Sequence, residues 1–222
     1  MRISRQTFSS ATVLSAIALL AIPSSLLGSG GGSSPSPTPP PPVMELTARD
    51  HYERGLKLRD KAWELEEKAT KEPEKAEKYL KKAGKEFEKA ARSQREAIKM
   101  DSRMYQAYSS LGYALRRLGD YAGSIKAYDQ GLAIEPRYAE AIEYRAEAYL
   151  GLGRLDEAKD AYMHLFRADR ARADELLEAM QKWVDEKRAT AGDQMVEDFA
   201  AWVAERTQLA VQTAMVGSGR TW

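Results

Sequence analysis

The stretch LGYALRRLGDYAGSIKAYDQGLAIEP, residues 111–136, is rich in helix-forming residues, yet it holds glycine at positions 112, 119, 123 and 131. A glycine inside a helix costs about 1 kcal/mol relative to alanine. Small residues offset that cost where two helices cross, because their backbones approach closely and gain dispersion contacts. The stretch therefore predicts a pair of tightly crossing helices. The small residues expected at the crossing are Gly112, Ala114, Ser124 and Ala127, and Gly119 is expected in a left-handed turn.

The same pattern recurs after 34 residues. Residues 105–138 align with residues 139–172, and each range predicts two helices, near 104–118 and 121–134 in the first range. A fixed period of this length indicates a protein of stacked repeats. The identical pairs are Ala107 with Ala141, Ala114 with Ala148, Leu118 with Leu152, Gly119 with Gly153, Ala127 with Ala161, and Tyr128 with Tyr162.

The repeat resembles the tetratricopeptide repeat (TPR), whose signature is W-x2-L-G-x2-Y, then A-x3-F, then P. The matching residues are Tyr108, Leu111, Gly112, Leu115, Ser124, Tyr128 and Pro136 in residues 105–138, and Ile142, Arg145, Ala146, Tyr149, Ala158 and Tyr162 in residues 139–172, where Arg170 replaces the proline. The resemblance implies an all-α fold, a short TPR-type helical solenoid of two clear repeats.

Residues 45–104 resemble a repeat that is longer than the others. The segment from Ala48 to Met104 has 57 residues rather than 34, which adds about 17 Å to a pair of helices. Apolar and small residues recur there at heptad spacing, typical of two antiparallel helices packed along a seam. We expect an elongated first helical hairpin that projects beyond the solenoid. The seam residues are His51, Gly55, Leu58, Ala62, Leu65 and Ala69 in the first helix and Ala76, Leu80, Ala83, Phe87, Ala90, Gln94 and Ala97 in the second.

Residues 173–216 predict C-terminal capping helices, which a helical stack needs at its end. The helical pattern breaks at Gly192 and Asp193 and resumes with an apolar face. That second helix has two interpretations, packing against the first capping helix or self-association through residues 193–216. Its apolar residues are Met195, Val196, Phe199, Trp202, Val203, Leu209 and Ala210. Residues 217–222 are predicted to be a disordered tail.

The N-terminal residues have the order of a targeting segment. A short basic start precedes an apolar run over residues 11–27, which predicts a signal peptide or an N-terminal membrane anchor over residues 1–28. Residues 29–44 form a Gly/Ser/Pro-rich linker. We therefore expect an exported protein, periplasmic or associated with the cell envelope, with secretion and a tether through residues 11–27 left open.

Charge and composition exclude several classes of chemistry. The formal net charge is +1, and residues 1–44 contribute +2, so no strong positive field favours nucleic acid. Without cysteine there are no disulfides or thiolate metal sites. His51 and His164 each lack a second histidine at helical spacing, and no catalytic motif is present. The sequence predicts no enzyme activity, no metal and no cofactor.

In TPR proteins the first helices of successive repeats line a concave surface, so the resemblance implies a groove for a protein or peptide partner. The groove is expected to run from cationic and aromatic to acidic. Its residues would be Tyr52, Leu56, Arg59, Gln106, Ser109, Tyr113, Arg116, Glu140, Glu143, Tyr144 and Glu147. Tyr52 and Leu56 stand where relatives that clamp acidic peptides have lysine and asparagine, which argues against that clamp. The expected role is an adaptor or assembly factor.

A basic stripe along the hairpin supports an alternative function. Its residues are Lys71, Lys75, Lys78, Lys82, Lys85, Lys89 and Arg92. They would bind anionic lipid headgroups, an acidic polymer or an acidic partner, or else form a solvated flank facing Glu64, Glu66 and Glu67. The alternative is an envelope structural protein that attaches to an anionic surface or self-associates through the lysine-rich hairpin and the C-terminal helix.

Overall fold

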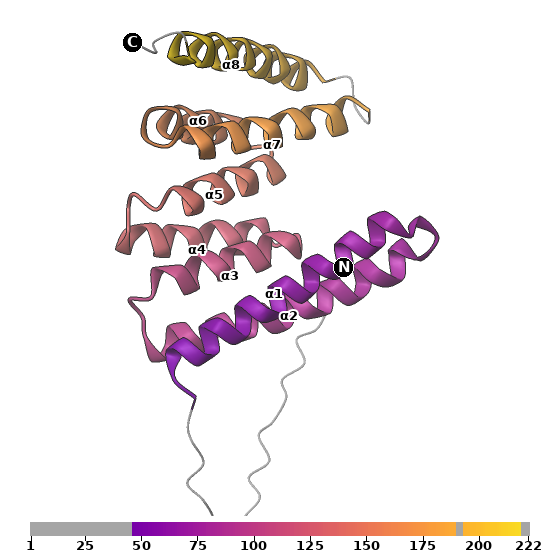
Figure 1. Cartoon of the computed structure of the whole chain (residues 1–222), viewed down its shortest axis with the longest axis vertical. Coiled ribbons are helices and arrows are strands. Elements are labelled where there is room, and N and C mark those ends of the chain that lie inside the picture. The colour runs from indigo at the N-terminus through magenta and orange to yellow at the C-terminus, as the bar shows by residue number, and fades with distance from the viewer. Residues whose placement is uncertain (1–45, 190–192, 219–222) are drawn as a thin grey trace, which may run out of the picture. The chain divides into compact units, whose positions relative to one another are not determined.

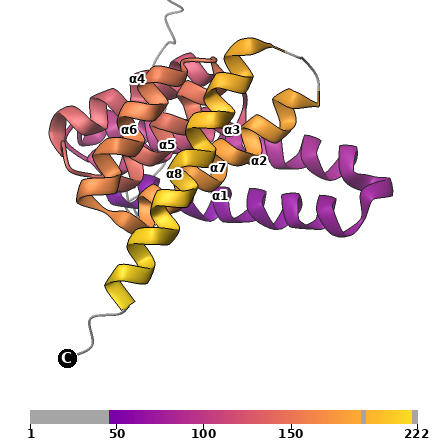
Figure 2. The same ribbon diagram turned by 90° about the horizontal axis from the view of Figure 1, so that it is seen from above.

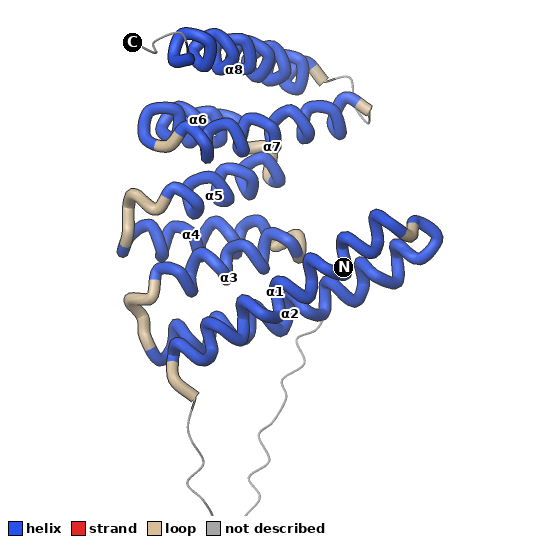
Figure 3. Tube along the Cα trace, in the orientation of Figure 1, coloured by secondary structure: helices blue, strands red, loops and turns tan. Residues whose placement is uncertain are grey.

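The structure is a computed structural model that describes residues 46–189 and 193–218. In this part of the chain it has eight α-helices joined by short loops, and no strand (Figure 3). The predicted targeting segment and linker, residues 1–44, lie outside the described residues. The predicted tail begins inside a helix, because residues 217 and 218 end the last helix; residues 219–222 are not described.

The first two helices, α1 (Ala48–Lys71) and α2 (Ala76–Met100), form the elongated hairpin. The 3-10 helix Pro73–Lys75 makes the turn, and Thr47 caps α1 in a capping box with Asp50. Alanines and Phe87 are buried along the seam, as the heptad pattern predicts. Leu80 is the exception, with 51% exposure, because no third helix covers the tip of the hairpin.

The repeats comprise α3 (Tyr105–Arg117) with α4 (Tyr121–Ile134), and α5 (Ala139–Gly151) with α6 (Leu155–Ala168). Gly119 and Gly153 reverse the chain in the left-handed region, at φ values of 81° and 70°. After α3 the N–H of Gly119 donates to the carbonyl of Arg116 at 2.9 Å, and that of Asp120 donates to Leu115 at 3.0 Å. Both turns thus satisfy carbonyls at the end of a helix, as predicted for Gly119.

The crossing of α3 and α4 confirms the expected close approach. A Cβ atom added to Gly112 would lie 2.8 Å from the ring of Tyr128, which is fully buried. The hydroxyl of Ser124 donates to the carbonyl of Gly112 at 2.8 Å across the same crossing. In the next repeat Ala146 and Tyr162 are both fully buried at the matching positions. At the start of α4, Gly123 leaves room for the carboxylate of Asp120, which caps the helix.

The end of the stack is covered by α7 (Arg170–Arg188) and α8 (Gln194–Ser218). Phe199 and Val203 of α8 are buried against α7, and the ring of Trp202 meets that of Tyr162 edge-on at 5.5 Å. Met195 remains 47% exposed. The apolar face of α8 thus packs against the capping helix over its first half.

The helices lie in two rows (Figure 1). The first helices of successive pairs, α1, α3, α5 and α7, contact one another directly and form what we call the inner row. The second helices, α2, α4, α6 and α8, form the outer row, in which α6 and α8 meet through the rings of Tyr162 and Trp202. Among the described residues, α2 with α4 and α4 with α6 lack backbone contacts comparable to those of the inner row. Seen end-on in Figure 2, the hairpin runs out past the other helices. The inner row is therefore the tight side of the solenoid.

Replacement of Gly112 by alanine should destabilise the fold by about 1–3 kcal/mol, because the added methyl group meets the Tyr128 ring. The matched control is Gly84→Ala in α2, where an added Cβ meets nothing within 4 Å. That control should gain stability, by up to about 1 kcal/mol, from helix propensity alone. Urea unfolding followed by circular dichroism measures both, and equal shifts in the two variants would contradict the close crossing.

Candidate partner-binding surface

The predicted groove residues all lie on the inner row, in α1, α3 and α5. None is fully exposed. Ser109, Tyr113 and Glu143 are buried. The half-buried residues are Tyr52, Leu56, Arg59, Gln106, Arg116, Glu140, Tyr144 and Glu147. Many of these side chains contact each other across helices, so the inner row is a packed seam over much of its length.

An aromatic cluster joins the hairpin to the repeats. The ring of Tyr113 meets Trp63 at 5.7 Å and Tyr144 at 5.2 Å, both edge-on. The indole N–H of Trp63 donates to the hydroxyl of Tyr113 at 2.6 Å, and the Arg59 guanidinium lies 4.3 Å above the indole ring. Sequence reasoning missed Trp63 because it lies in the extension of the hairpin, outside the repeat signature.

Ion pairs connect each inner helix to the next. Arg117 of α3 pairs with Glu66 of α1. Arg116 of α3 lies 2.5 Å from the carboxylate of Glu147 in α5, and Arg172 of α7 lies 2.8 Å from that of Glu143. The predicted change from a cationic to an acidic end is therefore neutralised, because arginines of neighbouring helices bind the acids of α5. A repeat signature describes one unit and does not include partners in the adjacent units.

The carboxyl group of Glu143 has an unusual environment. It is only 4% exposed, and burial raises its pKa to about 7, although the Arg172 guanidinium opposes this rise. The nearby carboxylates of Glu175 and Glu147 add to the rise. Burial likewise raises the pKa of Glu147, against the opposing charge of Arg116. Both acids face arginine partners within the inner row and are not placed on an open surface.

The start of the inner row is more accessible. Tyr52, Leu56 and Gln106 are half-buried and form no ion pair among the described residues, and Glu140 accepts a hydrogen bond from the hydroxyl of Tyr138 at 2.8 Å. This set presents an aromatic ring, an aliphatic side chain, an amide and a carboxylate. Such a mixture suits a peptide or protein surface. Within the described ranges no three metal-ligating side chains come together.

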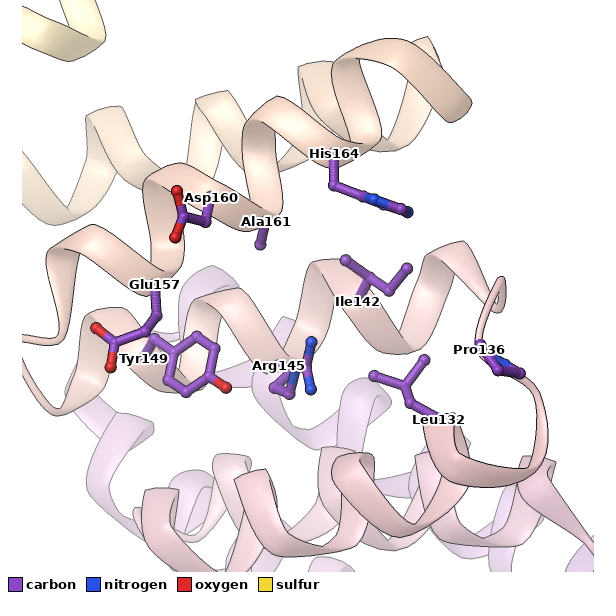
Figure 4. Close-up of a pocket in the computed structure, with 9 residues that line it drawn as sticks. All are labelled: Leu132, Pro136, Ile142, Arg145, Tyr149, Glu157, Asp160, Ala161 and His164. Atoms are coloured by element: carbon purple, nitrogen blue, oxygen red, sulfur yellow. The ribbon is translucent and has the colours of Figure 1, made fainter.

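The outer row has a groove that the sequence analysis did not predict (Figure 4). It lies between α4 and α6 over α5 and encloses about 400 Å³. In the middle of it, Arg145 of α5 pairs with Asp129 of α4 at 2.5 Å. Its lining residues are Leu132, Pro136, Ile142, Arg145, Tyr149, Glu157, Asp160, Ala161 and His164. The sequence held one signal for this groove. The spacing of three and four residues between Glu157, Asp160 and His164 places them on one face of α6.

Glu143 should make the stability of the fold depend on pH. Its pKa is raised from 4.5 to about 7 in the folded state, so its contribution is fully present below pH 4.5 and is lost as the pH rises through 7. Glu143→Gln keeps an acceptor for Arg172 and should reduce this loss. Thermal unfolding between pH 4.5 and pH 8 measures the slope, with the exposed Glu64→Gln as control. An unchanged slope in Glu143→Gln would show that Glu143 titrates normally.

Comparison with known proteins agrees with the repeat geometry. The family model of the tetratricopeptide repeat matches residues 78–139 and 110–173. No curated protein matches the chain.

Solved structures similar to it include the first TPR of Spaghetti (RPAP3) bound to the HSP90 peptide SRMEEVD, at 17% identity and a TM-score of 0.36 over 68% of this chain and 95% of that one. Two crystal structures of MamA match at 16% and 17% identity, with TM-scores of 0.42 and 0.45, over 76% and 79% of this chain and 99% and 96% of theirs. With helix pairs that repeat every 34 residues and small residues at their crossings, residues 78–173 of this chain carry tetratricopeptide repeats.

Proposed function

We propose that the chain is an exported scaffold that binds a protein or peptide partner on its inner row and acts as an adaptor or assembly factor in the cell envelope. The observation that carries the proposal is the set of ion pairs between neighbouring inner helices, Arg117 with Glu66, Arg116 with Glu147 and Arg172 with Glu143. They hold four helices in one arrangement before any partner arrives. A preformed surface loses little conformational entropy on binding.

We propose that the partner is bound by those residues of the predicted groove that form no ion pair between the inner helices. Tyr52, Leu56 and Gln106 meet that condition at the start of the inner row, on α1 and α3. Tyr113 and Arg116, by contrast, support the fold through ring contacts and an ion pair. A test that replaced Tyr113 or Arg116 would confuse lost binding with lost stability.

The inner-row proposal predicts a difference between two triple variants. Tyr52→Ala, Leu56→Ala and Gln106→Ala together should weaken partner capture at least about tenfold, because they remove side chains from the inner face. Glu157→Ala, Asp160→Ala and His164→Ala change the outer groove instead and serve as the matched control. The measurement is affinity capture from the native envelope, followed by titration of the identified partner. Loss of capture in the control alone would move the site to the outer groove.

Export is a separate part of the proposal, supported by the basic start and the apolar run of residues 11–27. Among the helices that the structure describes, none is long and apolar enough to span a bilayer. Residues 1–44 fused to alkaline phosphatase should give an active enzyme in a bacterial host, because this reporter needs disulfides that form outside the cytoplasm. Replacing Leu19 and Leu20 with arginine should abolish that activity. An inactive fusion with the unmodified segment would contradict export.

A further inference from the structure

One face of α2 points away from α1 and carries a dense group of cations. Lys78, Lys81, Lys82 and Lys85, which we call the lysine face, are all exposed. Their spacing of three and four residues places them on one side of the helix, opposite the seam residues Ala83 and Phe87. The lysine face contains the centre of the predicted basic stripe, together with Lys81.

Three lysines of the stripe are paired with acids, whereas its centre and Arg92 form no ion pair among the described residues. Lys71 pairs with Glu67, Lys75 with Glu72, and Lys89 with Glu86, at 2.5, 2.5 and 2.8 Å. Among the described residues, the lysine face forms no ion pair with any acid.

The acids expected to face the stripe are engaged elsewhere or lie apart. Glu66 binds Arg117 of α3, Glu67 binds Lys71 of its own helix, and Glu64 forms no ion pair with the lysine face. Glu77, one turn before Lys81, forms none either. The lysine face is thus a solvated flank without an ion pair to the glutamates of α1. The physical reason is that the lysine face points away from α1.

The arrangement has an energetic consequence within the helix. Lys78 lies three and four residues from Lys81 and Lys82, and Lys85 lies at the same distances from the same two residues. Like charges at these spacings weaken a helix, and Glu74 and Glu77, four residues before Lys78 and Lys81, offset part of the repulsion. A surface of negative charge laid along α2 relieves this repulsion, so the free lysine face favours an anionic partner.

We propose that the lysine face binds an anionic lipid surface. Lysine binds phosphate as a compact point charge, and it is depleted from the interfaces that proteins form with one another. The face holds no aromatic side chain on which a nucleic-acid base would stack. It also holds no apolar residue, so the hairpin lies on the headgroups without inserting. The four lysines extend over about 10 Å of one straight helix, which suits a plane of charge better than a cavity.

The N-terminal sequence is compatible with this proposal, although the proposal rests on the lysine face. The Gly/Ser/Pro-rich composition of residues 29–42 is that of a linker, so a chain held by residues 11–27 would keep the hairpin near the same membrane. Two weak attachments to one surface reinforce each other. The lysine face acts as the electrostatic one of the two.

The experiment measures partition of the full chain onto vesicles at 0.1 M salt. One set is pure phosphatidylcholine, and the other contains 30% phosphatidylglycerol, so that any insertion of residues 11–27 contributes to both sets. The test variant carries Lys78→Gln, Lys81→Gln, Lys82→Gln and Lys85→Gln. The control variant changes the net charge equally at exposed sites on other elements, with Arg103→Gln, Lys126→Gln, Arg137→Gln and Arg167→Gln.

We expect the test variant to lose at least about 30-fold in partition onto the anionic vesicles, and the control variant to lose much less. Partition onto phosphatidylcholine should be unchanged in both. Equal losses in the two variants, or no loss in the test variant, would overturn the proposal. Circular dichroism verifies that the variants stay helical, and a salt titration of the unmodified chain tests the same claim without mutation. An unmodified chain that ignores phosphatidylglycerol but binds polyglutamate or RNA would assign the face to another polyanion.

Discussion

The structure depends on the close approach of backbones where paired helices cross. Gly112 has no side chain, so the ring of Tyr128 lies directly on the backbone of α3, and Ser124 bonds to the Gly112 carbonyl at the same point. Ala146 and Tyr162 occupy the matching places one repeat later. Bulkier residues at these crossings would separate the helices and remove the contacts between neighbouring repeats. The dispersion gained there offsets the helix propensity that glycine gives up.

Close packing within each pair leaves the two rows with different properties. The inner helices contact each other directly and use tyrosines and arginine–glutamate pairs to fill the space between them. The outer helices α4 and α6 stand farther apart, and a groove opens between them. A residue on the inner face therefore has two tasks, since it supports its neighbours and forms the surface. Tyr113 and Arg116 are committed to the first task through ring contacts and an ion pair, whereas Tyr52 forms a hydrogen bond with Ser110 and Gln106 forms no ion pair among the described residues.

The sequence predicted those features that repeat. The period of 34 residues located α3 to α6, and the left-handed Gly119 followed from its place after a helical pattern. The heptad spacing predicted the hairpin. Features that depend on unlike residues in different repeats were not predictable in this way. Trp63 contacts Tyr113 over a separation of 50 residues, and no periodic signal reports such a pair. Leu80 follows the heptad pattern but lies at a tip that nothing covers.

The hydrogen bond between Trp63 and Tyr113 gives the hairpin a fixed direction. It joins the extension of α1 to the middle of α3, so the long arm does not swivel freely about its base. The angle between the arm and the inner face is thereby built into the protein. If a surface held the arm, this angle would set the orientation of the inner face relative to that surface.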